Sequence, residues 1–263
     1  MKIRTCAVAG MFYPRDPHHL EQLLETFFRG KDRGTDALGV VSPHAGYPYS
    51  GDVSATAFSA FDPEFSGTFV LIGPSHRGYR TSVSLLPWET PLGIVDNDQE
   101  FGSAIGLDCD EVSHQDAENS LEVQVPFIKY RFPRARIVPI LMGNQDYPSA
   151  VMLSEAILDA VRETKRSDLR FVASSDFSHY VPAEKAHSDD HYAIEALETL
   201  DVEEFYRRIT ERRVSACGVG PIAAMCLVCR ELGAKSGELI RYATSGDVTG
   251  DPTVVGYAAI TVM

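Results

Sequence analysis

Short apolar runs alternate with longer segments of helical periodicity along most of the chain. Two of these runs, Thr68–Ile72 and Leu169–Ala173, lack any polar alternation, which is typical of strands buried on both faces of a sheet. Between such runs, segments like Ala150–Lys165 place apolar residues at helical spacing. Strands that alternate with helices predict an α/β fold, with a mostly buried central sheet and helices on both of its faces.

The predicted elements are short and are separated by Gly, Pro and polar residues. Strands are expected at Leu38–Ser42, Thr68–Ile72, Ser82–Leu86, Arg136–Leu141 and Leu169–Ala173, and near 237–243 and 253–262. Helices are expected at Gly51–Phe61, Ser120–Phe132 and Ala150–Lys165, and near 186–199, 201–211 and 217–232. The stretch Gly30–Gly39 is interpreted as a loop before the first core strand. Because no repeat or linker divides the chain, residues 1–263 are expected to form a single three-layer αβα domain.

Composition narrows the class of protein. The net charge of −13 argues against nucleic acid as a main partner, because phosphate binding needs a basic face. A basic cluster, Arg207, Arg208, Arg212 and Arg213, is interpreted as a solvated helix face. The five cysteines are an odd number without a secretory signal, and no apolar run reaches the length of a membrane span. A cytoplasmic protein with no membrane partner is therefore expected.

Three histidines follow apolar strands by a few residues. His44 comes after the strand that ends at Ser42, His76 after the run that ends at Ile72, and His179 after the segment Leu169–Ala173. In open α/β sheets, ligands bind in the crevice outside the carboxyl ends of the strands. Imidazoles held there by rigid backbone would suit a divalent metal, although each histidine alone could instead be a hydrogen-bonded structural residue. Their shared position favours one metal-capable pocket.

Cys217 is a further candidate, because it directly precedes the apolar helix expected near 217–232. A thiol at a helix N-terminus is expected to have a lowered pKa and could act as a thiolate ligand or a nucleophile. The alternative is a small buried apolar residue. Cys226 and Cys229 lie inside the apolar helix and are interpreted as packing residues.

Acidic residues near these positions could orient an imidazole, transfer protons or complete a ligand set. Asp176 lies three positions before His179. Glu118 and Glu122 are four residues apart and would share one helix face, and His114 lies just before them. Together, His179, Asp176, His114 and Glu122 are the candidate catalytic residues.

Asp247 lies on a Gly-rich turn before the last strand, where turn chemistry explains it as well as function does. The chain contains no phosphate-binding loop, no dinucleotide-binding glycine motif, no nucleophile elbow and no zinc-protease helix motif. These absences weaken the nucleotide-dependent and serine-hydrolase interpretations.

Seven motifs resemble the Memo family in order and spacing, a family called AmmeMemoRadiSam system protein B in prokaryotes. They are AGMFYP, SPHAGYPYSG, LIGPSHRG, ENSLEVQVPF, SSDFSHY, CGVGPI and YATSGDVTGD, and they extend over essentially the whole chain. The resemblance implies a fold similar to that of the class III extradiol ring-cleaving dioxygenases. It also implies an iron or copper site with His44, His76 and Cys217 as ligands, a donor set that would suit zinc as well.

The resemblance implies more about the pocket. Asp176 and His179 would line it, and Phe12 would lie at its mouth, where some relatives carry Trp. Many relatives carry His where this chain has Asn119, so a proton shuttle is not expected at that position, and His114 is the alternative. The prokaryotic family name also implies a pathway shared with a radical-SAM protein and an AMMECR1-like protein. This chain lacks the cysteine motif of a radical-SAM enzyme.

Three functions remain open from the sequence. The first is a nonheme metal-dependent redox enzyme, in which His179 acts as acid and base and Asp176 orients it. The second is a metal-assisted hydrolase or transferase that uses the same ligands. The third is a protein that binds a peptide or a small metabolite in the pocket without turnover.

Overall fold

A computed structural model describes residues 2–31, 34–116 and 118–263. It contains an eight-stranded mixed sheet and a separate two-stranded hairpin of β4 and β5. The strands are β1 (Gly39–Ser42), β2 (Thr68–Pro74), β3 (Ser82–Val83), β4 (Trp88–Thr90), β5 (Gly93–Val95), β6 (Arg136–Met142), β7 (Leu169–Ser174), β8 (His179–Pro182), β9 (Gly237–Thr244) and β10 (Thr253–Val262).

The sheet has the order β3–β6–β2–β7–β1–β10–β8, and β9 pairs with β10. Its centre is parallel, because β6, β2, β7 and β1 run in the same direction, whereas β3 and β10 join as antiparallel neighbours. Three adjacent parallel strands, β2, β7 and β1, therefore end at the same edge of the sheet. This edge is the ligand-binding side of an open α/β sheet.

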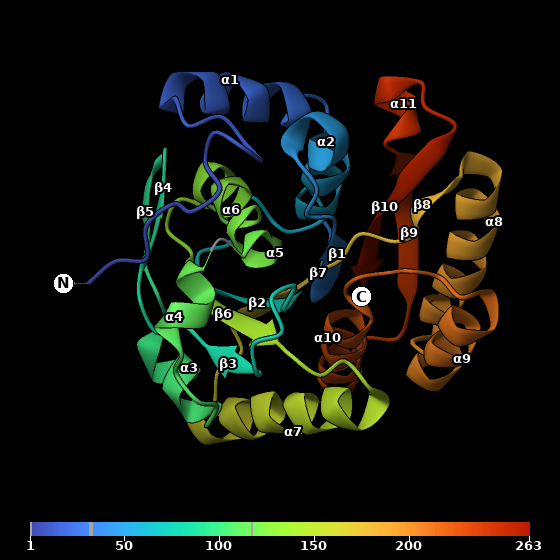
Figure 1. The fold of residues 1–263 in the computed structure, drawn as a ribbon. Coiled ribbons are helices and arrows are strands. Elements are labelled where there is room, and N and C mark those ends of the chain that lie inside the picture. Colours follow the sequence, from blue (N-terminus) through green and yellow to red (C-terminus); the bar gives the residue numbers. More distant parts are fainter. Residues whose placement is uncertain (1, 32–33, 117) are drawn as a thin grey trace.

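Helices cover both faces of the sheet, as Figure 1 shows, with α1, α2, α5 and α6 on one side and α7 and α10 on the other. The helices are α1 (Pro17–Phe28), α2 (Tyr47–Phe58), α3 (Gln99–Ala104), α4 (Glu111–Gln115), α5 (Asn119–Glu122), α6 (Val125–Arg131), α7 (Tyr147–Thr164), α8 (Ala183–Ile194), α9 (Val202–Arg212), α10 (Val219–Glu231) and α11 (Gly246–Thr249), with a 3₁₀ turn at Glu195–Thr199. The predicted three-layer αβα fold is confirmed. None of the described helices is long and apolar enough to cross a membrane.

Each face of the sheet has its own hydrophobic core. On the side of α1, α2 and α6 the core is rich in aromatic residues, among them the buried side chains of Phe58, Phe69 and Phe127. On the side of α7 and α10 it is mainly aliphatic and includes Ile157 and Ile222. The strands between the two cores are buried on both faces, which is why their sequences show no polar alternation.

Several predicted boundaries are wrong for identifiable reasons. Helix α7 begins at Tyr147 rather than Ala150, because the Asp146 side chain accepts a hydrogen bond from the Ser149 amide and caps the helix. The single helix expected at Ser120–Phe132 is two helices, α5 and α6, and Pro126 lies in the first turn of the second. Strand β8, the β4–β5 hairpin and the short helices α3, α4 and α11 were not predicted from the sequence. Residues 32 and 33 of the expected loop lie outside the described residues.

At the opposite end of the parallel strands, the buried Asp98 carboxylate joins three segments of the chain. It pairs with Arg166 at 2.7 Å and with Arg136 at 3.2 Å, and it accepts hydrogen bonds from the Thr68 hydroxyl and the Phe101 amide. Burial alone would raise the pKa of Asp98, but the Thr68 and Arg166 hydrogen bonds outweigh it and lower the pKa below its usual value of 3.8. The ionised form therefore stabilises the fold.

We expect Asp98→Asn to reduce the free energy of unfolding by about 1–3 kcal/mol at pH 7, the usual cost of leaving buried hydrogen-bonding groups without a partner. Because the folded-state pKa is lowered, the contribution of the carboxylate is complete above pH 3.8 and is lost as the pH falls through the folded-state value. Urea unfolding of both proteins at pH 7 and at several pH values below 4 measures this. If the difference in free energy of unfolding between the two proteins stays constant below pH 4, the stabilising role of the ionised Asp98 carboxylate is contradicted.

Candidate metal centre

The carboxyl ends of β1, β2 and β7 carry the functional side chains. His44 lies two residues after β1, His76 two residues after β2, and Asp176 two residues after β7. Cys217 comes from the loop just before α10, and its amide donates a hydrogen bond to the Asp176 carbonyl oxygen at 3.2 Å. Strand pairing and the loop before α10 thus bring together residues that are up to 173 positions apart in the chain.

His44, His76 and Cys217 form one compact donor group. One potential ligand atom from each residue lies within 4.8 Å of the others, and among the described residues no other set of three or more His, Cys, Asp and Glu side chains meets this condition. Cys217 Sγ lies 3.0 Å from His44 Nε2, and the two imidazole rings are 5.1 Å apart at their centres. His44 is buried, whereas 38% of the His76 side chain is exposed, so the group faces solvent on the His76 side.

Glu118 holds His76 through two hydrogen bonds. Its carboxylate accepts one from His76 Nδ1 and one from the His76 amide, both at 2.8 Å. The Glu118 hydrogen bond raises the pKa of His76. Burial raises the pKa of Glu118, but the bonds from His76 outweigh it and lower that pKa to about 2. Since Nδ1 donates to a carboxylate, Nε2 is the atom of His76 that points to the donor group.

His44 is held from three directions. Its amide donates to Asp176 Oδ1 at 2.8 Å, its Nδ1 lies 2.9 Å from Ser174 Oγ, and its carbonyl oxygen accepts a hydrogen bond from the Asn119 side-chain amide at 3.0 Å. Burial lowers the pKa of His44 to about 4, because the imidazolium form would lose its hydration. The ring is therefore neutral at pH 7, the form in which imidazole binds a metal.

Cys217 is fixed by its backbone and its neighbours. Gln145 donates to the Cys217 carbonyl oxygen at 2.8 Å, and the Asp176 amide donates to Cys217 Sγ at 3.2 Å. Gly218 allows the close approach, because a Cβ there would lie 2.4 Å from the Ser174 carbonyl oxygen. The expectation of a lowered thiol pKa is wrong. Burial, followed by the Asp176 charge, raises the pKa of Cys217, and α10 begins only at residue 219.

His179 and Phe12 contact the segments that carry Cys217 and His44. His179 opens the edge strand β8, and its Nδ1 donates to the Ser215 carbonyl oxygen at 2.8 Å, which leaves Nε2 as its free nitrogen. The Phe12 carbonyl oxygen accepts from the Tyr47 amide at the start of α2, three residues after His44.

His114 and Glu122 lie in a different cluster, against the N-terminal segment of the chain. Glu122 pairs with Arg4 and accepts hydrogen bonds from the Tyr13 hydroxyl and from two backbone amides. His114 is buried against Trp88, with ring centres 6.0 Å apart, and burial lowers its pKa to about 4. These contacts explain both residues as structural. The sequence alone could not tell which way the Glu122 side chain points.

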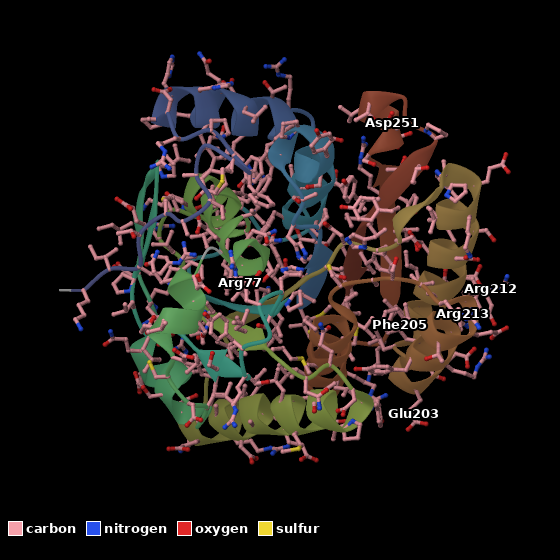
Figure 2. All side chains as sticks on the ribbon, in the orientation of Figure 1. Arg77, Glu203, Phe205, Arg212, Arg213 and Asp251 are labelled. Atoms are coloured by element: carbon pink, nitrogen blue, oxygen red, sulfur yellow. The ribbon has the colours of Figure 1, made fainter. Side chains whose placement is uncertain are left out.

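Asp247 and the arginine cluster are also explained by local structure. Asp247 accepts hydrogen bonds from the Thr244 amide and hydroxyl across the turn before β10. Arg207 and Arg208 both pair with Glu204 on the same helix, as expected of a solvated helix face. Figure 2 shows Arg212 and Arg213 at the outer edge of the view, whereas the half-exposed Arg77, the residue after His76, lies near the middle of the view.

Three side chains that hold the candidate ligands were not predicted from the sequence: Ser174, Gln124 and Gln145. Ser174 opens the motif SSDFSHY, of which only Asp176 and His179 were candidates. Polar residues within otherwise apolar runs are the signal that could have found Ser174 and Gln124, because a buried polar side chain must have a partner.

Comparison with known proteins identifies the same family as the motifs do. The family model described as Memo-like protein matches residues 4–261. A protein named as a MEMO1 family protein from Methanococcoides burtonii is 46% identical over 99% of this chain and all of its own length. Similar proteins from Methanosarcina barkeri and Nitrosopumilus maritimus are 44% and 38% identical, over 99% and 98% of this chain and over 100% and 98% of their own lengths.

Proposed function

The chain belongs to the Memo-like protein family, and on this premise we propose that it binds iron or copper through His44, His76 and Cys217 and acts as a nonheme metal-dependent redox enzyme. The observation that carries the proposal is the convergence of the three donor atoms within 4.8 Å. Two imidazole nitrogens and one sulfur are a donor set that iron and copper accept. A small molecule or a peptide segment would enter from the solvent-facing side at His76.

The surrounding residues fit a metal. A bound cation needs imidazoles whose second nitrogen is held by an acceptor, and both histidines meet this condition through Ser174 and Glu118. The carboxylates of Glu118 and Asp176 would also offset the positive charge of the ion. Iron or copper, when bound, would supply one-electron redox chemistry.

The chain itself would orient the substrate and transfer protons. His179 is suited to proton transfer, because its Nδ1 is occupied by the Ser215 carbonyl and its Nε2 can accept or return a proton. Asp176 holds the His44 amide and the Cys217 loop together, so its role is to keep the ligands in position. Asn119, bonded to the His44 carbonyl, contributes a neutral amide that does not titrate.

Anaerobic purification followed by elemental analysis tests the metal. We expect the native protein to retain iron or copper in an equimolar amount and His44→Ala to retain only background metal. His191→Ala is the matched control, because His191 lies on α8 and its Nδ1 bonds to the His187 carbonyl. Equal metal content in native protein and His44→Ala, or none in either, would refute the proposal.

Dioxygen titration of the metal-loaded protein tests the redox part. We expect oxygen consumption or an oxidation-state change by electron paramagnetic resonance with iron or copper, and neither with zinc. A zinc-loaded protein that turns over a substrate without oxygen would instead favour a metal-assisted hydrolase or transferase, since zinc has no redox chemistry of its own.

A further inference from the structure

We propose that Ser174 is a positioning residue that fixes His44 as the tautomer with its proton on Nδ1, so that the Nε2 lone pair faces Cys217 and His76. This inference rests on the proposed metal function for its purpose, but the proton position can be measured without any metal. It depends on a closed set of hydrogen bonds around one buried hydroxyl, formed by residues from β1, β7 and the segment between α5 and α6.

The Ser174 hydroxyl has three neighbours and only one proton. Its oxygen lies 2.5 Å from the Ser120 carbonyl oxygen, 2.9 Å from Gln124 Nε2 and 2.9 Å from His44 Nδ1. A carbonyl oxygen can only accept, so the hydroxyl proton must point to Ser120. The two lone pairs that remain accept from the other neighbours. His44 Nδ1 must therefore be the donor and carry the proton.

The orientation of Gln124 is fixed independently. Its Nε2 also lies 2.9 Å from the Pro43 carbonyl oxygen, which again can only accept, so this atom is the amide nitrogen and not the oxygen. Its Oε1 accepts from the Ser42 hydroxyl at 2.8 Å. With both amide hydrogens in use, one toward Pro43 and one toward Ser174, Gln124 cannot accept a proton from the Ser174 hydroxyl.

Burial makes each of these hydrogen bonds necessary. Ser42, Ser174 and Gln124 are fully buried, so no water can replace a missing partner without cost. The opposite tautomer would leave two acceptors, His44 Nδ1 and the Ser120 carbonyl, competing for one hydroxyl proton. The proposed tautomer satisfies each of these groups. It also leaves Nε2 free to accept from the Cys217 thiol, 3.0 Å away, or to bind a metal when the thiol proton leaves.

The two histidine ligands are thus oriented in different ways. His76 donates to the charged carboxylate of Glu118, whereas His44 donates to a neutral hydroxyl within an uncharged network. Outer partners of either kind orient an imidazole, but only the carboxylate adds negative charge beside the ring.

Nuclear magnetic resonance of metal-free protein with ¹⁵N-labelled histidine tests the proposal directly. The ¹⁵N shifts of a neutral imidazole distinguish the protonated nitrogen from the bare one. We expect Nδ1 of His44 to be protonated in the native protein and the proton to move, wholly or in part, to Nε2 in Ser174→Ala. Affinity for Fe²⁺, measured anaerobically, should fall by about 10-fold to 100-fold in the same variant.

Ser42→Ala is the matched control. Ser42 and Ser174 are register partners on the adjacent strands β1 and β7, both are fully buried, and both bond to Gln124, but Ser42 does not contact the His44 ring. This variant should lose comparable stability and keep both the His44 tautomer and the Fe²⁺ affinity. Protonated Nε2 in native protein, or equal effects of the two variants, would overturn the proposal. If the native protein has the proton of His44 on Nδ1 but does not bind Fe²⁺, only the proposed function is refuted.

Discussion

Cys217→Ser is expected to weaken Fe²⁺ or Cu²⁺ binding by more than about 100-fold, because loss of a ligand should exceed the 10-fold to 100-fold cost of losing an outer partner. The thiol can release its proton and give a soft, charged donor, whereas the serine hydroxyl stays protonated and binds such ions poorly. Serine is close to cysteine in size, so Gln145 can still hold the loop through the backbone carbonyl at position 217. Anaerobic titration with a competing chelator measures the change.

Cys109→Ser is the control for this experiment. Cys109 is exposed and is a free thiol, so its loss tests whether surface cysteines account for the metal that is measured. We expect native affinity in this variant. An affinity that falls equally in both variants, or in neither, would show that the sulfur of Cys217 is not a ligand.

Glu122→Gln is expected to reduce the free energy of unfolding by about 3–5 kcal/mol, the usual cost of breaking a buried ion pair by removing one partner. The Arg4 guanidinium is buried and lies over the Trp88 ring at 4.3 Å, so without Glu122 its charge has lost its closest counter-ion. Glutamine also has only one acceptor oxygen where the carboxylate serves Arg4, Tyr13 and the amides of residues 7 and 8. Urea unfolding at pH 7 measures the loss.

The double variant Arg4→Met with Glu122→Gln separates charge from packing. Removing the arginine also removes the unpaired buried charge, so the double variant should be more stable than Glu122→Gln alone. A catalytic role for Glu122 would give a different result: the single variant would lose activity at nearly native stability. A loss of stability below about 1 kcal/mol in Glu122→Gln would contradict the structural role.

The sequence by itself determined the class of fold and the positions of the candidate histidine ligands just after the strands. Unbroken apolar runs such as Thr68–Ile72 are typical of strands buried on both faces, and the loops after parallel strands meet at one edge. That rule placed His44 and His76 correctly at a common edge, because it depends only on local periodicity and strand direction. The position of Cys217 before an apolar helix made it a candidate, and the motif resemblance then implied that it is a ligand.

Only the tertiary structure decided which polar residues serve the pocket. Glu118 and Glu122 differ by four positions, yet one holds His76 and the other holds Arg4, because Glu118 is the extended N-cap outside α5 whereas Glu122 is the last residue of that helix. The pKa of Cys217 likewise depends on burial by distant segments, which outweighs any effect of the helix that follows it. Sequence patterns record neighbours along the chain, whereas hydrogen bonds and desolvation are set by neighbours in space.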